Sequence, residues 1–436
     1  MIKLFDRLNQ ETLDLEYSLS KAGFEGTSVV LNDDGYLPHG FTSPYAFFCD
    51  YPQGVVAPLY FNEVPVPKLW QITGTNTQGE IWNYSDKKAN IYYHNPKHLR
   101  LVRSVDWIGQ NGKIYVTDHY NQQGKLFAKT YFDQNQRLTH KIYYDAFNKE
   151  VIVDNIVTGD ILLDWQGKTY HFKKRVDFFL FYLRKSGLDT SQIWYNSLAM
   201  PFLISYYLEN TGDDILFWQE SIGDQVPGNM KLILSQRATR TKKIVVQKRE
   251  SYERLMKLLT PEEQKYVDYL GYIYPSKREN YNQKEILILT NSDSIEGLDC
   301  LLSELSGYHF HIAALTEMSQ RLMQYEGSEQ VTLYPNISPN QVEQLFKQCD
   351  IYLDINHGSE IMSAVRTAFE SNLIIAAFDN TKHHPEFVLE EAIFNHSNPI
   401  DLARWLKNCN DLKQLVAKQR LFTGQEDVDR YQSVLS

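Results

Sequence analysis

The C-terminal third of the chain alternates apolar, strand-length runs with stretches of helical spacing, and this alternation constrains the fold more than any other feature. Units of this kind predict a parallel sheet with helices on both faces. Ligands of such sheets bind beyond the carboxyl ends of the strands, where the turns TNSD, PNIS and NHGSE occur here. The runs are EILILT (285–290), FHIAAL (310–315), VTLYP (331–335), DIYLDI (350–355) and LIIAAFD (373–379).

The first forty residues and the region after residue 172 show a similar α/β pattern. LNQETLDLEYSLSKAG (8–23) has apolar residues at helical spacing and ends at a glycine, and TSVVLNDD (27–34) predicts a buried strand. A second Rossmann-like domain is therefore expected. Its later helices are predicted in RVDFFLFYLRKSG and MPFLISYYLEN, and its later strands in QIWYNSL, DILFWQE and KLILSQ (231–236).

Residues 45–172 have a different sequence pattern, with short runs of alternating apolar and polar residues that are rich in Tyr, Trp, Val and Ile. Turn sequences such as QNGK and NQQG separate runs such as PLYFNEV, KIYVTDHY and KLFAKTYF, which predicts an antiparallel meander without helices. In NIYYHN and KIYYDA, two tyrosines are adjacent, so their side chains should point to opposite faces of the strand. Packing within the sheet explains some of them. We expect others on the outer face, where exposed aromatic rings suit an extended polypeptide or a partner protein.

These sequence patterns predict an α/β chain with three domains. The N-terminal Rossmann-like domain is discontinuous and comprises residues 1–44 and 173–275. The inserted β-sheet domain comprises residues 45–172, and the C-terminal Rossmann-like domain comprises residues 276–436. The polar segment YPSKRENYNQK (274–284) is the predicted linker.

Charge and cysteine usage exclude several classes of protein. A formal net charge of −10 disfavours an extended nucleic-acid footprint. The four cysteines are far apart and form no metal-binding or disulfide pattern. No secretory signal and no apolar stretch of about 18 residues is evident, so we expect a cytoplasmic protein without a metal or cofactor.

The sequence resembles the GtfB family over nearly its whole length. The family is built on the GT-B glycosyltransferase architecture, and its members are non-catalytic partners of GtfA in the accessory Sec system of Gram-positive bacteria. The resemblance implies a subunit that stabilises a GtfA-type O-GlcNAc transferase, presents a serine-rich repeat adhesin to it, and assembles with two copies of each subunit. It is carried by LNDDGYLP (31–38), LWQITGTN (69–76), VDFFLFYLRKSGLD with IWYNSLAMPFLISYYL (176–208), TNSDSIEG (290–297), YLDINHG (352–358) and IFNHS (393–397).

An active retaining GT-B enzyme needs cations beside the diphosphate of its sugar donor, commonly as Arg-x4-Lys after the first strand of this domain. The matching positions here are Asn291 and Glu296. Reversing a charge about 4 Å from a diphosphate, at an effective dielectric near 20, turns an attraction of about 4 kcal/mol into a comparable repulsion. Arg366 and Arg237 are the candidates for a replacement cation.

The same enzymes commonly use a Glu-x7-Glu pair to hold sugar and ribose hydroxyls. Counting back from Glu370 gives Met362, and the nearest preceding acid is Glu360. On a continuous helix the side chains of Glu360 and Glu370 differ by about 280° around the axis and do not share a face, unless a turn intervenes. The donor site is therefore predicted to be degenerate.

Other polar residues have both structural and functional interpretations. Asp354, Asn356 and His357 follow a predicted strand at the ligand-binding edge, where they contact a ligand or cap a turn. His309 and His311 share a strand face without a third metal ligand, and the pair His383–His384 is interpreted as a solvated loop. The basic run from Arg237 to Arg249 is a solvated surface, an acidic-partner site or a membrane contact, which leaves peripheral attachment at the inner membrane face open.

The leading hypothesis is a non-catalytic subunit that binds a GtfA-type glycosyltransferase and a serine-rich acceptor. The alternative is an active retaining UDP-sugar-dependent glycosyltransferase with a divergent donor site. The two hypotheses differ in whether the chain binds UDP-GlcNAc by itself.

Overall fold

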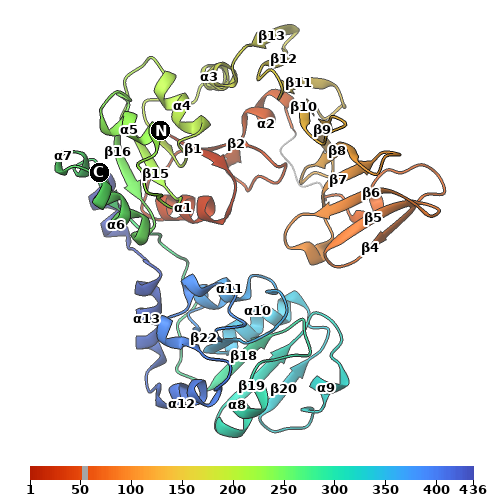
Figure 1. Cartoon of the computed structure of the whole chain (residues 1–436), viewed down its shortest axis with the longest axis vertical. Coiled ribbons are helices and arrows are strands. Elements are labelled where there is room, and N and C mark those ends of the chain that lie inside the picture. The colour runs from red at the N-terminus through yellow and green to blue at the C-terminus, as the bar shows by residue number, and fades with distance from the viewer. Residues whose placement is uncertain (52–56) are drawn as a thin grey trace. The chain divides into compact units, whose positions relative to one another are not determined.

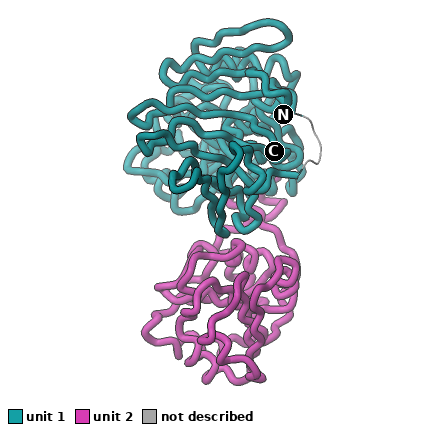
Figure 2. Tube along the Cα trace, turned by 90° about the vertical axis from the view of Figure 1, so that its right-hand side faces the viewer, with its two compact units in different colours: residues 1–270, 434–436 teal, residues 271–433 magenta. Residues whose placement is uncertain are grey.

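The computed structural model describes residues 1–51 and 57–436, which form two compact units (Figure 2). Unit 1 comprises Met1–Leu270 with Val434–Ser436, and unit 2 comprises Gly271–Ser433. In the described residues, unit 1 holds a parallel and an antiparallel sheet, and unit 2 holds a parallel sheet. The predicted fold class is confirmed. Residues 52–56 of the predicted insertion lie outside the described residues.

The parallel sheet of unit 1 has the order β17-β16-β15-β14-β1-β2-β3, so its direction of winding reverses between β1 and β14. Apolar side chains from the central strands and the flanking helices form its core. The strands are β1 (Ile2–Arg7), β2 (Thr27–Asn32), β3 (Phe41–Thr42), β14 (Ile193–Tyr195), β15 (Asp214–Trp218), β16 (Thr241–Val246) and β17 (Val267–Tyr269). The helices are α1 (Gln10–Lys21), α2 (Pro44–Cys49), α3 (Arg175–Ser186), α4 (Met200–Tyr207), α5 (Gly228–Leu234), α6 (Arg249–Leu258) and α7 (Pro261–Gln264).

The antiparallel sheet is a meander in which each strand pairs with its neighbours in sequence, from β4 at one edge to β13 at the other (Figure 1). Two 3-10 turns, η1 (Phe61–Glu63) and η2 (Lys97–Leu99), flank its first strands. The strands are β4 (Gln71–Gly74), β5 (Gln78–Asn83), β6 (Asp86–Tyr93), β7 (Val102–Ile108), β8 (Ile114–Tyr120), β9 (Leu126–Phe132), β10 (Leu138–Tyr144), β11 (Glu150–Asn155), β12 (Ile161–Trp165) and β13 (Lys168–Phe172).

Unit 2 has the strand order β20-β19-β18-β21-β22-β23, all parallel, and its winding reverses between β18 and β21. The strands are β18 (Glu285–Leu289), β19 (His309–Ala313), β20 (Val331–Tyr334), β21 (Ile351–Asp354), β22 (Ile374–Phe378) and β23 (Ile393–Phe394). The helical elements are α8 (Leu298–Glu304), α9 (Gln320–Met323), α10 (Pro339–Gln348), α11 (Ala364–Glu370), η3 (Pro385–Phe387), η4 (Glu390–Ala392), α12 (Ile400–Asn408), α13 (Leu412–Phe422) and α14 (Val428–Leu435), the last of which ends in unit 1.

Several local predictions were wrong. KLILSQ lies mostly in α5, where Met230, Ile233 and Leu234 are buried at helical spacing. The central strand β1 was not predicted. PLYFNEV contains η1 in place of a strand, and α2 is a helix inside residues 45–172. Each of these elements is short, so its type depends on packing more than on a local repeat.

The tyrosine prediction was wrong for KIYYDA, because Tyr143 and Tyr144 are both buried. The ring of Tyr143 stacks on Tyr45 of α2, with ring centroids 4.0 Å apart. The Tyr144 carbonyl accepts a hydrogen bond of 2.7 Å from the Tyr51 hydroxyl. Both faces of β10 are therefore covered. Exposed aromatic side chains of this sheet include Tyr84, Tyr115 and Phe147.

Three of the six basic side chains between Arg237 and Arg249 form ion pairs inside unit 1. Arg240 is buried and forms an ion pair with Asp214 at 2.8 Å. Lys243 and Lys248 pair with Asp268 and Glu11, and Arg249 lies over the Tyr269 ring. This run is thus mainly structural.

None of the helices in the described part of the chain has the length and apolarity needed to span a bilayer.

The predicted linker is bound to unit 2 through several side chains. Arg278 forms an ion pair with the fully buried Asp350, whose other oxygen accepts bonds from the backbone of Tyr281 and Gln283. Asn280 donates to the carbonyls of Asp350 and Asn372 at 3.0 and 2.8 Å. Residues 274–284 therefore form an ordered strap on unit 2.

Candidate functional site

The predicted donor edge lies where the winding of the unit 2 sheet reverses. Residues 290–297 follow β18, and residues 355–363 follow β21. The two loops are joined directly, because Ile295 and Asn356 form a β-bridge and the Glu296 amide donates to the Ile355 carbonyl at 2.9 Å. Such a reversal point is where an open α/β sheet usually binds its ligand.

Asn291 fills part of this edge with its own side chain. Its amide nitrogen donates to the carbonyl and hydroxyl oxygens of Ser359 at 3.0 and 2.9 Å. Its amide oxygen accepts from Asn356 at 3.1 Å. A Cβ atom added at Gly358 would lie 1.5 Å from that oxygen, so a larger residue at position 358 would displace the Asn291 side chain. Asn291 therefore holds the loop after β21.

Glu296, at the position of the expected lysine, accepts hydrogen bonds from two other loops. His357 Nε2 lies 2.6 Å and Asn380 Nδ2 2.9 Å from its Oε2 atom. Burial raises the pKa of Glu296, but these two hydrogen bonds outweigh it and hold the pKa below its ordinary value. Glu296 is thus an anion that joins the loops after β18, β21 and β22.

Asp354 binds a histidine that sequence reasoning assigned to a solvated loop, and that assignment was wrong. His383 Nδ1 lies 2.6 Å from Asp354 Oδ1, and His383 Nε2 lies 2.9 Å from the Gly358 carbonyl. A carboxylate and a carbonyl only accept hydrogen bonds, so the ring donates from both nitrogens and is cationic. Burial alone would lower the pKa of His383, but these partners raise it above its ordinary value.

Glu360 and Met362 precede helix α11, which begins at Ala364. Glu360 Oε1 accepts from the Val365 amide at 3.0 Å, and its Oε2 lies 3.2 Å from His384. Met362 and Ser363 both have left-handed backbone conformations, with φ of 52° and 51°. Of the two cases that the sequence left open, a continuous helix or an intervening turn, the structure shows the turn, which separates Glu360 from α11.

Glu370, at the end of α11, is held by two cations. Its carboxylate oxygens lie 2.7 Å from Arg366 Nε and 2.8 Å from Lys277 Nζ. The Arg366 guanidinium also lies over the rings of Tyr274 and Phe387. Burial raises the pKa of Glu370, but the two cations bring it below its ordinary value. Arg366 and Glu370 thus fasten the strap to α11.

The structure brings most of the predicted site residues together. Asn291, Glu296, Asn356 and His357 connect the loops after β18 and β21, and Asp354 ends β21. Glu360 and Glu370 bind different partners at opposite ends of α11. Arg237 lies in unit 1, where its side chain is exposed after α5. The sequence analysis did not assign His383 and His384 to this edge, although they follow β22 and the carboxyl ends of parallel strands meet at one edge of the sheet.

A pocket of about 340 Å³ opens beside the loop after β18. Three carboxyl groups line it, from Asp293, Glu296 and Asp299, together with the guanidinium of Arg321. Tyr325 donates to Asp299 across it. Its carboxylates outnumber its guanidinium groups, so the pocket opposes a diphosphate and accepts hydrogen bonds from hydroxyl groups.

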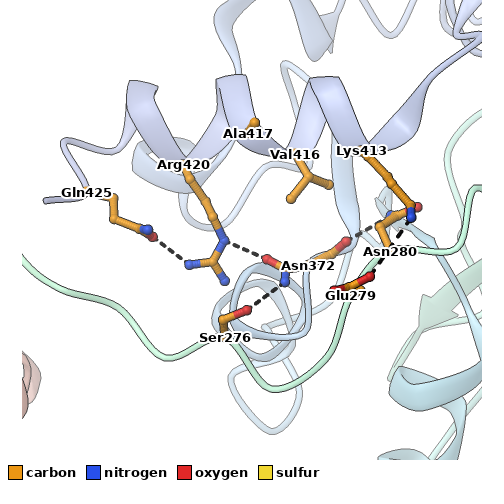
Figure 3. Close-up of a pocket in the computed structure, with 9 residues that line it drawn as sticks. All are labelled: Ser276, Glu279, Asn280, Asn372, Lys413, Val416, Ala417, Arg420 and Gln425. Atoms are coloured by element: carbon orange, nitrogen blue, oxygen red, sulfur yellow. Dashed lines mark hydrogen bonds and ion pairs between the residues drawn. The ribbon is translucent and has the colours of Figure 1, made fainter. Parts of the chain in front are cut away.

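A second pocket, of about 410 Å³, lies between the strap and α13 (Figure 3). Arg420 donates to Asn372 and Gln425, both at 2.5 Å, and Asn372 donates to Ser276 at 2.8 Å. The pocket contains none of the predicted site residues. Its polar groups bind one another and hold the strap in place.

Two parallel Rossmann-like sheets with an inserted antiparallel sheet place the chain in the GT-B-like class of α/β proteins. Domain models of one family match successive parts of the chain. They are the GtfB N-terminal domain (2–48), the GtfB middle domain (70–173), the GtfB third domain (175–258) and the GftB/GlyA-F C-terminal domain (286–421).

Full-length relatives agree with these matches. A UDP-N-acetylglucosamine–peptide N-acetylglucosaminyltransferase stabilizing protein GtfB from Streptococcus parasanguinis is 58% identical over 96% of this chain and 95% of its own length. One from Streptococcus agalactiae is 48% identical over 100% and 99%. A chain of a GtfA/B complex crystallised with UDP and GlcNAc matches with a TM-score of 0.94 and 42% identity, over 100% and 99%. The chain belongs to the GtfB family.

Proposed function

We propose that the chain is a non-catalytic subunit that stabilises a GtfA-type peptide O-GlcNAc transferase. One observation carries the proposal: a relative that is 58% identical over 95% of its own length is a stabilising protein for such a transferase. A chain with a TM-score of 0.94 to this one occurs in a GtfA/B complex. The complex would contain two copies of each subunit, and glycosylation would precede export by the accessory Sec system.

The donor site of this chain is proposed to be degenerate. The expected cation positions carry Asn291 and Glu296, and both side chains are already bound by neighbouring loops. Met362 replaces the first acid of the expected pair, and Glu370 is bound by Arg366 and Lys277. A UDP-sugar would have to displace these contacts and place its diphosphate near the carboxylates of the adjacent pocket.

The acceptor in this proposal is a serine-rich repeat adhesin, bound in part by the inserted sheet. We also propose the domain division 1–44 with 173–275, 45–172 and 276–436, which follows the three sheets. Removing residues 45–172 would delete nearly all of α2 and uncover α3, because Phe127, Tyr143 and Ile152 pack in the same core as α3. Point substitutions are therefore better tests than the deletion.

The complex would lie in the cytoplasm, with a peripheral place at the inner membrane face as part of the proposal.

Co-expression tests the stabilising role. A GtfA-type transferase is produced alone, with this chain, and with a matched unrelated α/β protein, and its soluble yield and thermal unfolding are compared. The proposal predicts co-purification and a higher yield and unfolding temperature of the transferase with this chain only. The proposal is wrong if the two proteins do not co-purify and the transferase is equally stable in all three samples.

A further inference from the structure

The segment from Lys168 to Lys185 in unit 1 concentrates positive charge in a chain whose net charge is −10. It contains six basic side chains and one acidic side chain. Arg175 is paired with Asp154 at 2.7 Å. The other five cations are exposed and have no ion-pair partner among the residues that the structure describes. They are Lys168, Lys173, Lys174, Arg184 and Lys185.

Helix α3 lies beside β13, the edge strand of the inserted sheet, and brings cations from both elements together (Figure 1). The ring centroid of Phe181 on α3 lies 4.8 Å from that of Tyr170 and 5.3 Å from that of Phe172, both on β13. The Lys185 ammonium lies 5.5 Å from the Phe181 centroid. Lys168 shares a strand face with Tyr170, two positions away. Lys168 and Lys185 therefore flank the same group of rings.

A pocket of about 350 Å³ lies between α3 and the end of α4, and Phe172 belongs both to its lining and to this group of rings. Lys174, Arg184 and the exposed ring of Tyr207 also line it. Its carboxylates are those of Asp177 and Glu209. Five cations and two carboxylates give this region a net charge of +3. We call the region, with its rings and its pocket, the α3–β13 surface.

Aromatic and apolar side chains of the α3–β13 surface are only partly covered. Tyr170, Phe172 and Phe181 pack against the core of unit 1 and stay half-exposed. At the end of α4, Tyr206 and Tyr207 are 39% and 51% exposed. Tyrosine rings of this kind sit at the headgroup level of a bilayer, and lysine and arginine stems lie along apolar surface with the charge at the phosphates. Cations among half-exposed rings therefore suit a membrane–water interface.

The carboxylates within the α3–β13 surface help to distinguish its ligand. A nucleic-acid strand carries fixed, regularly spaced phosphates and follows a continuous basic track. Asp177 and Glu209 interrupt the cations here and would face some of those phosphates. Lipid headgroups move independently of one another, so anionic headgroups can gather beside the cations and leave the carboxylates to neutral ones.

We propose that the α3–β13 surface binds the anionic headgroups of a phospholipid bilayer. The inference rests on the peripheral membrane place in the proposed function and names the surface that provides it. Each lysine or arginine near an anionic bilayer strengthens binding about fivefold. A single copy therefore attaches weakly and reversibly, and a complex that presents two such surfaces to one bilayer attaches more tightly.

The test measures co-sedimentation of the full-length chain with vesicles of phosphatidylglycerol and phosphatidylcholine in equal parts. Lys174→Gln and Arg184→Gln should each weaken binding about fivefold, and together about 25-fold. Asp177→Asn removes an acid from the same surface and should strengthen binding about fivefold. Lys257→Gln, on α6, and Lys265→Gln, after α7, change the net charge of exposed sites equally and should bind as the wild type does.

The lipid and salt dependence completes the test. Binding should fall as the salt concentration rises, and vesicles of phosphatidylcholine alone should bind much less of the chain. Equal binding to both kinds of vesicle overturns the proposal. So does binding that neither the Lys174→Gln/Arg184→Gln double variant nor Asp177→Asn alters, in variants that unfold at the wild-type temperature. If the double variant unfolds early, Lys168→Gln with Lys185→Gln replaces it with the same expectation.

Other occupants of the surface give different results. Tighter binding of a single-stranded RNA oligonucleotide than of the vesicles, weakened by the same double variant, would make the surface a nucleic-acid site. Loss of co-purification with a GtfA-type transferase in that variant would assign the surface to the partner subunit. Either result overturns the proposal. Absence of any vesicle binding by the wild type removes the peripheral membrane place as well, whereas the stabilising role depends on the co-expression test alone.

Discussion

The carboxyl edge of the unit 2 sheet and the middle strands of the inserted sheet are both rich in polar side chains, but they differ in where the partners of those side chains lie. At the edge, Asp354, Glu296 and Asn291 are bound by His383, His357 and Ser359. In the inserted sheet, Thr117 donates to Asp106 on the neighbouring strand at 2.6 Å. Partners in the sheet therefore follow from strand pairing, whereas partners at the edge come from loops that are far apart in the sequence.

The largest expected effect is at Asp354, and it tests whether the edge serves folding. Asp354→Ala leaves the His383 imidazolium without its carboxylate in a largely buried place, which should lower the free energy of unfolding by about 3–5 kcal/mol. Urea unfolding measures the loss. Asp379→Ala, which breaks the exposed pair with His396, is the control and should stay near the wild type. A small loss for Asp354→Ala would show that the pair is not structural.

Gly358→Ala tests whether Asn291 occupies the edge tightly. The added Cβ collides with the Asn291 amide oxygen, and the overpacking should cost about 1–3 kcal/mol of unfolding free energy. Adding Asn291→Ala removes the obstructing group, so the double variant should be more stable than the sum of the two single changes predicts. Additive losses in thermal or urea unfolding would contradict this packing.

Glu370→Gln separates a structural acid from a donor-binding acid. Weakening the bonds to Lys277 and Arg366 should lower the free energy of unfolding by about 1–2 kcal/mol. Glycosylation by the complex with a GtfA-type transferase, measured below the unfolding temperature, should stay at the wild-type rate. A strong loss of transfer without a loss of stability would make Glu370 part of a working donor site and end the contrast between the two regions.

The pH dependence of stability gives the smallest expected effect. The pKa of His383 is raised in the folded chain, so its contribution is fully present below the ordinary histidine value of 6.5. That contribution is lost as the pH rises through the folded-state pKa. His383→Gln should therefore flatten the fall in unfolding free energy above pH 6.5, as measured by urea unfolding at several pH values. Parallel curves for the variant and the wild type would show that the ring is not held as a cation.

The sequence predicted the parts of the fold whose patterns repeat. The alternation of apolar runs predicted the parallel sheet of unit 2, and the turn sequences predicted the meander. The short strand β1 and the short helix α5 were missed or misassigned, because their types depend on the neighbours they pack against. Among the site residues, Asn291 and Glu296 could be found from spacing along one loop.

His383 could not be found in the same way, because its partner Asp354 is 29 positions earlier and the hydrogen bond depends on how the loops after β21 and β22 meet. The pairing of polar residues across the inserted sheet, such as Asp106 opposite Thr117, was also beyond reach. It depends on strand register, and a shift of one residue would turn a side chain to the other face.

Calorimetric titration of the folded chain with UDP-GlcNAc tests directly whether the carboxyl edge of unit 2 binds a sugar donor. We expect no saturable heat, because the polar side chains of the edge bind one another and the adjacent pocket is rich in carboxylates. A GtfA-type transferase, titrated in the same way, serves as the positive control. Saturable binding to this chain that Glu370→Ala abolishes would contradict a degenerate donor site and favour an active transferase with a divergent one.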